Sequence, residues 1–124
     1  MSTFQKGSAL VVLIAVVSLV AAMSAFGGAS ATDATTVAVT AGKPSELKFT
    51  LSKKVIAKGL TTFNVTNKGS LSHDFKIAGK KTPSLKAGKK ATIKVTFKKA
   101  GKFAFLCTVP GHAAGGMKGT LTVK

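Results

Sequence analysis

Apolar residues recur at every second position along most of this chain, in short segments separated by glycine, proline, lysine and asparagine. Side chains on a β-strand alternate between two faces, so this period is typical of strands with one buried face. No segment carries a helical period of useful length. The alternating sets are Val37 and Val39; Leu47, Phe49 and Leu51; Phe63 and Val65; His73, Phe75 and Ile77; Ile93, Val95 and Phe97; Phe103, Phe105 and Cys107; Leu121 and Val123. We predict an all-β antiparallel sandwich of about seven to eight strands.

Lysine supplies nearly all of the charge. The 19 basic residues are all lysines and face only three acids, so the formal net charge is +16. Lys48, Lys76 and Lys94 stand at the opposite parity to the apolar residues, and we expect them on a solvated face. Such a charge favours anionic partners. So few acids exclude the paired carboxylates of a glycosidase and the oxygen cage that calcium prefers.

Residues 1–31 have the features of an export signal. An apolar run from Ala9 to Ala22 follows a short start with one lysine, and Ala29 and Ala31 give the small-residue pattern that signal peptidase accepts. We predict cleavage after Ala31, which leaves a single domain over residues 32–124 in the periplasm or on the extracellular face of the cytoplasmic membrane. The alternative is that Leu10 to Phe26 persists as a membrane anchor.

Four residues carry soft donor atoms, and all four are candidate metal ligands: His73, Cys107, His112 and Met117. Thiolate and imidazole donors suit copper, and a His₂Cys plane with a weak axial methionine is its electron-transfer geometry. Zinc also accepts cysteine and histidine, but it generally takes a fourth strong donor or water. Taken singly, a buried cysteine more often packs as a small hydrophobe. The combination favours a metal, which would also stabilise a domain that has one cysteine and therefore no internal disulfide.

Strand parity separates the four candidates into two groups. His73, Cys107 and Met117 are in phase with core residues of their strands, so we expect them to point inward at strand ends. His112 follows Pro110 and Gly111 in a loop, and we expect one edge of its ring to face solvent. A site of this form is suited to passing electrons rather than binding a substrate.

Asp74 has two alternative interpretations. It follows His73 directly, and it is expected either to accept hydrogen bonds from Thr108, next to Cys107, or to be a solvated turn acid. In the first case it would connect the two ligand loops and tune the sulfur.

The stretches Cys107-Thr-Val-Pro-Gly-His112, Met117-Lys-Gly-Thr-Leu-Thr-Val and Ser72-His73-Asp74-Phe75 resemble the ligand motifs of the cupredoxins, the small type 1 blue copper proteins of azurin, plastocyanin and auracyanin type. The four residues between His112 and Met117 match auracyanin-like and rusticyanin-like spacing. The resemblance implies an eight-stranded Greek-key sandwich, one copper ion held by the four candidates, and shuttling of single electrons. No general acid, base or open coordination position is apparent in the sequence, so we expect no enzyme activity.

We expect outer-sphere electron transfer through His112. An apolar rim surrounds it, formed by Val109, Pro110, Ala113, Ala114 and Gly115. Lysines would steer acidic redox proteins to this rim. We expect a monomer that meets a membrane only through a retained N-terminal segment or through its surface charge.

Three alternative functions stay open: a copper carrier or storage protein with the same ligands, an electron-accepting subunit of a copper enzyme, and a nucleic-acid binder. The lack of arginine, tyrosine and tryptophan counts against nucleic acid as a partner.

Overall fold

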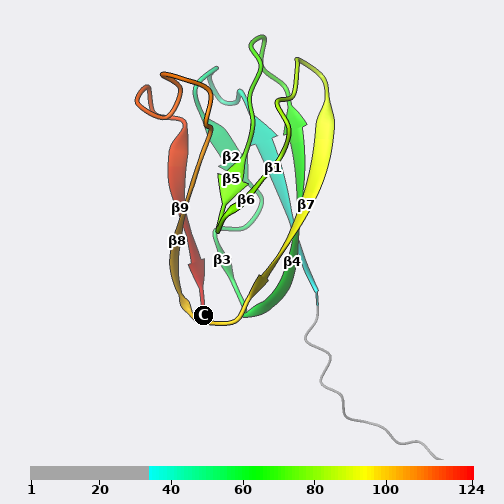
Figure 1. Ribbon diagram of the computed structural model, residues 1–124, viewed down its shortest axis with the longest axis vertical. Coiled ribbons are helices and arrows are strands. Elements are labelled where there is room, and N and C mark those ends of the chain that lie inside the picture. Colours follow the sequence, from blue (N-terminus) through cyan, green and yellow to red (C-terminus); the bar gives the residue numbers. More distant parts are fainter. Residues whose placement is uncertain (1–33) are drawn as a thin grey trace, which may run out of the picture.

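The computed structural model describes residues 34–124, which form nine strands in two sheets (Figure 1). The strands are β1 (Thr35–Ala41), β2 (Phe49–Leu51), β3 (Val55–Ile56), β4 (Gly59–Asn67), β5 (Lys76–Ile77), β6 (Lys80–Lys81), β7 (Lys90–Phe97), β8 (Gly101–Leu106) and β9 (Lys118–Val123). The first sheet has the order β2-β1-β4-β7 and the second β3-β9-β8-β5-β6. The predicted all-β sandwich is confirmed. The predicted export signal lies outside the described residues.

The core lies between the sheets and is built from alternate residues of each strand. In β1, for example, Val37 and Val39 are buried while their neighbours are partly or fully exposed. Phe75 stands at the centre, with ring centroids 5.4 Å from Phe63 of the first sheet and 5.5 Å from Phe105 of the second. Aromatic rings at such separations add to the free energy that apolar burial supplies. Lys48, Lys76 and Lys94 are exposed, as their parity predicts.

The predicted antiparallel pairing holds for most strand pairs but not for two of them. β1 runs parallel to β4 along its whole length, and β3 runs parallel to β9. Parallel neighbours require a crossover connection. Here the chain turns back through β2, enters the other sheet as β3, and returns as β4 beside β1. The strands β3, β5 and β6 have two residues each, too short for an alternating pattern, so the number of strands exceeds the prediction.

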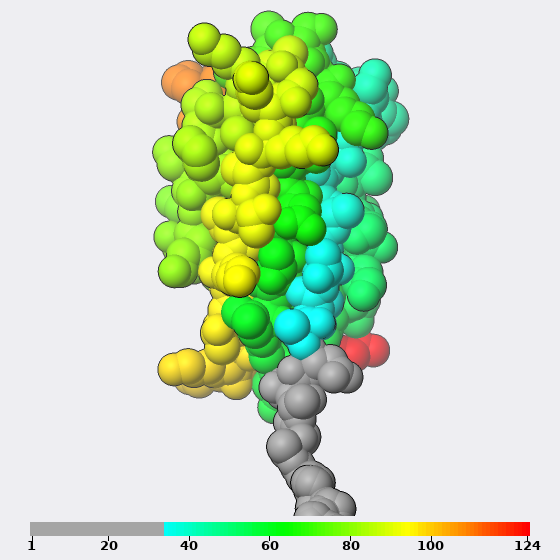
Figure 2. All heavy atoms as spheres, turned by 90° about the vertical axis from the view of Figure 1, so that its right-hand side faces the viewer, coloured from blue at the N-terminus to red at the C-terminus, as the bar shows by residue number. Residues whose placement is uncertain are grey.

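Four connections gather at the end of the sandwich opposite the C-terminus, namely those between β1 and β2, β4 and β5, β6 and β7, and β8 and β9 (Figure 1). The candidate ligands belong to the second and fourth of these connections. On the side shown in Figure 2, β1, β4 and β7 lie next to one another in cyan, green and yellow. Within residues 34–124 no helix is long and apolar enough to cross a membrane.

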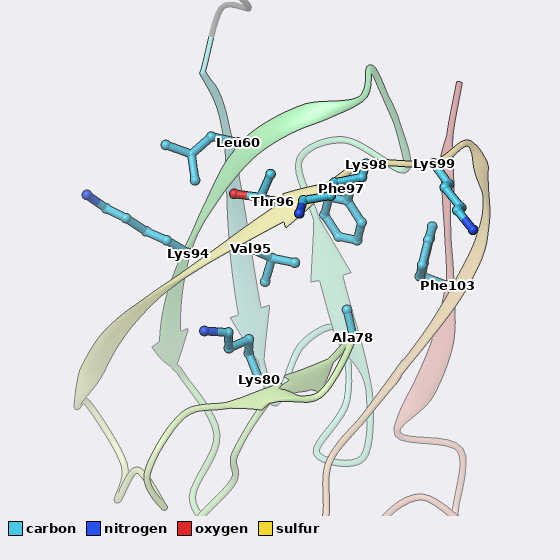
Figure 3. Close-up of a pocket in the computed structure, with 10 residues that line it drawn as sticks. All are labelled: Leu60, Ala78, Lys80, Lys94, Val95, Thr96, Phe97, Lys98, Lys99 and Phe103. Atoms are coloured by element: carbon cyan, nitrogen blue, oxygen red, sulfur yellow. The ribbon is translucent and has the colours of Figure 1, made fainter.

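A groove of about 550 Å³ opens along the β7 edge, where the two sheets part (Figure 3). Its apolar lining includes Val95, Phe97 and Phe103, and its lysines are Lys80, Lys94, Lys98 and Lys99. None of the four candidate ligands lines it. The hollow is therefore separate from the residues that carry the predicted chemistry.

Candidate metal centre

The structure brings three of the predicted ligands together. The ligand atoms of His73, Cys107 and His112 all lie within 4.8 Å of one another. The two Nδ1 atoms are 3.2 Å apart, and Nδ1 of His112 is 3.6 Å from Sγ of Cys107. Each imidazole thus turns the same ring nitrogen toward the shared centre.

His73 is held by the backbone on both sides. It lies before β5 and forms an isolated bridge with Leu85, in which each residue's N–H donates to the other's carbonyl at 3.0 and 2.7 Å. The buried side-chain amide of Asn67 donates to the carbonyls of Leu71 and Leu85, at 2.7 Å each. The His73 side chain is fully buried. The bridge to Leu85 therefore fixes the His73 backbone, although the residue lies outside the named strands.

Cys107 and Met117 flank the connection between two paired strands. Cys107 follows β8 directly, Met117 precedes β9 directly, and the Cys107 N–H donates to the Met117 carbonyl at 3.1 Å. Both side chains are buried, and they form a small apolar cluster with Ala41. Leu47, Phe49 and Val109 pack against this cluster. The inward direction predicted for both side chains is confirmed.

Burial raises the pKa of the Cys107 thiol above its ordinary value. The backbone N–H of Asp74, which lies 3.4 Å from Sγ, acts in the opposite direction because it stabilises the thiolate. A cation at the centre would replace the thiol proton, so metal binding there couples to proton release.

His112 lies in a tight turn that spans residues 110–116. The Met117 N–H donates to the His112 carbonyl at 3.0 Å, which closes the loop back onto the β9 end. Gly115 packs closely in this turn: a Cβ atom built there would lie 2.6 Å from Cδ1 of Leu47, so the Leu47 side chain would have to shift to admit a larger residue. His112 is partly exposed, in agreement with the expectation from its place after Pro110.

The interpretation of Asp74 as a bridge is confirmed. Its Oδ1 accepts the Thr108 N–H at 2.6 Å, and its Oδ2 accepts the Thr108 hydroxyl. The carboxylate is buried, and Lys81 Nζ approaches Oδ2 at 3.8 Å. Asp74 therefore ties the His73 loop to the Cys107 loop through both its side chain and its own N–H.

Glu46 is a further residue of the site, and the sequence patterns did not predict it. Its Oε1 lies 2.7 Å from Nε2 of His73, and its carboxylate also accepts the N–H groups of Ser70 and Leu71 at 2.9 to 3.0 Å. The Ser70 and Leu71 N–H groups, followed by the His73 ring, lower the pKa of Glu46 from its ordinary 4.5 to about 2. The one feature of the sequence that could have indicated Glu46 is the rarity of acids, since it is one of three in a chain with 19 lysines.

The donor set fits a soft or borderline metal ion. Bonds to imidazole nitrogen and thiolate sulfur are typically about 2.0 and 2.3 Å, so two ligands on one ion lie up to about 4 Å apart. The separations of 3.2 and 3.6 Å that His112 makes with His73 and Cys107 satisfy this limit. Nitrogen and sulfur donors in this combination suit copper or zinc rather than calcium or magnesium.

Comparison with known proteins gives a family and several structural relatives. A family model described as a cupredoxin-like domain matches residues 10–123. Auracyanin A from Chloroflexus aurantiacus, a "blue" copper protein, is 19% identical with a TM-score of 0.63, covering 74% of this chain and 100% of its own. Dithionite-reduced auracyanin from Roseiflexus castenholzii is 26% identical with a TM-score of 0.57, covering 78% and 99%. Rusticyanin from Thiobacillus ferrooxidans is 23% identical with a TM-score of 0.61, covering 73% and 77%. The search of curated proteins gave no match.

Proposed function

We propose that this chain, which belongs to the cupredoxin-like domain family, holds one type 1 copper ion and carries single electrons between redox partners. His73 and His112 would bind the ion through Nδ1, Cys107 through Sγ and Met117 through its thioether. Copper held by these ligands would supply a Cu(II)/Cu(I) redox couple, because the same ligand set accepts both oxidation states with little rearrangement.

One observation carries the proposal: the donor atoms of His73, Cys107 and His112 converge within 4.8 Å, although His73 lies 39 positions from His112 in the chain. The family match over residues 10–123 supports the same conclusion, as does the auracyanin of Roseiflexus castenholzii, which is 26% identical and was studied in a reduced state. Met117 is included because its buried side chain packs in the same cluster as Cys107.

The buried ligands and the partly exposed ligand would have different roles in such a site. The buried side chains of His73, Cys107 and Met117 exclude water and a substrate from their side of the centre. The partly exposed His112 is the single candidate ligand near the surface, so its ring is the route by which an electron would leave or enter. We therefore propose an electron carrier rather than an enzyme.

The surface around His112 supports a transient contact with an acidic redox protein. Val109 and Ala113 are partly exposed, and Pro110, Ala114 and Gly115 are exposed. Electron-transfer contacts are usually small, and long-range charge attraction acts mainly on their association rate. We further propose that the chain is exported, works outside the cytoplasm and acts as a monomer.

The test is the visible absorption spectrum of the oxidised, copper-loaded protein. We expect an intense sulfur-to-copper charge-transfer band that Cys107→Ser abolishes. The matched control is Lys118→Ala, which changes an exposed residue next to Met117 and should keep the band. If Cys107→Ser keeps the band, the assignment of the sulfur ligand is wrong.

A second measurement separates an electron carrier from a copper carrier with the same ligands. An electron carrier should retain Cu(I) for hours in the presence of a strong Cu(I) chelator, because His73 and Cys107 are buried. Rapid and complete loss of Cu(I) to the chelator would favour copper delivery instead.

A further inference from the structure

Glu46 contacts the ring of His73 on the side away from the candidate centre. The two residues are 27 positions apart in the chain, and Oε1 of Glu46 lies 2.7 Å from Nε2 of His73. His73 is fully buried, while the side chain of Glu46 is about one-third exposed. A carboxylate thus reaches from the surface to a nitrogen that no solvent touches.

The carboxylate is itself fixed in place. The N–H groups of Ser70 and Leu71 donate to it, so it is held at three points: two backbone amides and one ring nitrogen. Gly69 makes room for this arrangement, because a Cβ atom built there would lie 2.3 Å from Oε1 of Glu46. Amides that donate to a carboxylate stabilise its charged form. The His73 ring therefore faces an immobilised anion.

An immobilised anion at Nε2 decides where the proton of a neutral imidazole resides. Nε2 must carry the proton in order to donate to Oε1, and this leaves the lone pair on Nδ1. Nδ1 of His73 is the atom that faces the centre, 3.2 Å from Nδ1 of His112. A carboxylate hydrogen-bonded to the far nitrogen of a ligating histidine also strengthens that histidine as a donor.

We propose that Glu46 is a positioning residue, which sets the Nε2–H tautomer of His73 and makes its Nδ1 a stronger donor, so that the bound metal favours the higher oxidation state. The tautomer does not depend on any metal. The effect on oxidation state rests on the proposed copper function.

The metal-free protein tests the tautomer directly. The ¹⁵N chemical shifts of the imidazole nitrogens should show Nε2 of His73 protonated and Nδ1 unprotonated at neutral pH. In Glu46→Gln, an amide oxygen at the Oε1 position still accepts the Leu71 N–H and still faces Nε2 of His73, but it carries no negative charge. The preference for the Nε2–H tautomer should therefore weaken, and a measurable fraction of the Nδ1–H tautomer should appear. A proton on Nδ1 of His73 in the wild-type protein overturns the proposal, and this result needs no variant to fold.

The copper-loaded protein tests the tuning. At equilibrium with ferricyanide and ferrocyanide, Glu46→Gln should shift the Cu(I)/Cu(II) ratio toward Cu(I) by roughly tenfold, the lower end of the effect that partners of metal-bound histidines have on metal affinity or activity. Ser45→Lys is the matched control, because it makes the same one-unit change of charge at an exposed neighbouring position without touching His73. An equal shift in both variants would reduce the role of Glu46 to general electrostatics and overturn the tuning. A protein without the charge-transfer band refutes the copper function and leaves the tautomer result standing.

Discussion

The end of the sandwich that carries the candidate metal centre and the lysine-lined groove at the β7 edge differ in how their polar groups are held. At the centre, the carboxylates of Glu46 and Asp74 each make several hydrogen bonds to a loop distant in sequence, and the Asn67 side chain donates to Leu85. In the groove, Lys80 and Lys94 rim an apolar floor, and neither forms an ion pair with a described acid (Figure 3). The groove is at the β7 edge, whereas the candidate ligands converge at the end of the sandwich, where hydrogen bonds hold their loops in place. Volume alone is therefore a poor guide to function in this fold.

Two glycines with nearly the same φ angle provide the sharpest contrast. Gly42 has φ of +83° and Gly79 has φ of +80°, so an alanine is strained at both, by about 1 kcal/mol. A Cβ atom at Gly42 would also lie 2.4 Å from Cα of Gly69, whereas nothing lies within 4 Å of one at Gly79. Since a backbone contact cannot be relieved by a rotamer change, Gly42→Ala should lower the free energy of unfolding by about 3–4 kcal/mol in total. Urea denaturation measures both, and equal losses would contradict this contrast.

Removing the Asp74 carboxylate should cost nearly as much. Asp74→Ala leaves the Thr108 N–H without its acceptor in a part-buried site, and hydrogen bonds to charged groups contribute about 1.5–3 kcal/mol each. We expect a loss of about 3 kcal/mol in the free energy of unfolding. The groove counterpart, Lys94→Ala, removes an exposed charge and should change it by less than about 0.5 kcal/mol. A similar small effect at both positions would show that Asp74 does not brace the two loops.

Low pH should lower the free energy of unfolding, because Glu46 becomes protonated. The fold holds the pKa of Glu46 at about 2, below its ordinary 4.5. A depressed carboxyl pKa contributes stability that is complete above 4.5 and is lost as pH falls toward 2. The wild-type protein should therefore be more stable than Glu46→Gln near neutral pH, and the difference should shrink across this interval. Urea midpoints of both proteins, measured without metal at several pH values, check this, and a constant difference would contradict it.

The smallest effect concerns the association rate with an acidic redox protein. Lys48 Nζ lies over the His112 loop, 2.9 Å from where a Cβ atom of Gly116 would stand, whereas Lys94 lines the groove. At low ionic strength, Lys48→Gln should slow electron transfer roughly twofold and Lys94→Gln less, since steering depends on charges near the contact. Stopped-flow kinetics at increasing salt measure both. A rate that is flat with ionic strength would exclude steering by charge altogether.

Local pattern was enough to predict the layers of the fold and most of the centre. Alternation gave the inner faces of the long strands, and parity gave the inward direction of Cys107 and Met117 beside β8 and β9. Adjacency in sequence also led to the Asp74–Thr108 contact, since each residue follows a candidate ligand. These predictions succeeded because a two-residue period or a neighbouring position carries the information.

Contacts between residues far apart in the chain could not be predicted from local sequence patterns. The parallel pairing of β1 with β4 depends on a crossover through the other sheet, which no local period reports. The contact of Glu46 with His73 joins residues 27 positions apart, and it depends on how closely the turn at Gly42 approaches Gly69. Such an approach is a property of two loops in space, so the sequence of either loop alone does not contain it.

The connection between β8 and β9 carries Cys107, His112 and Met117 between two strands that pair along their length. The Cys107 N–H donates to the Met117 carbonyl at the base of this connection, so a change in the length of the loop would displace His112 most, while the two paired strands keep their register. His73, supplied by a different part of the chain, would stay in place whatever the length of that loop.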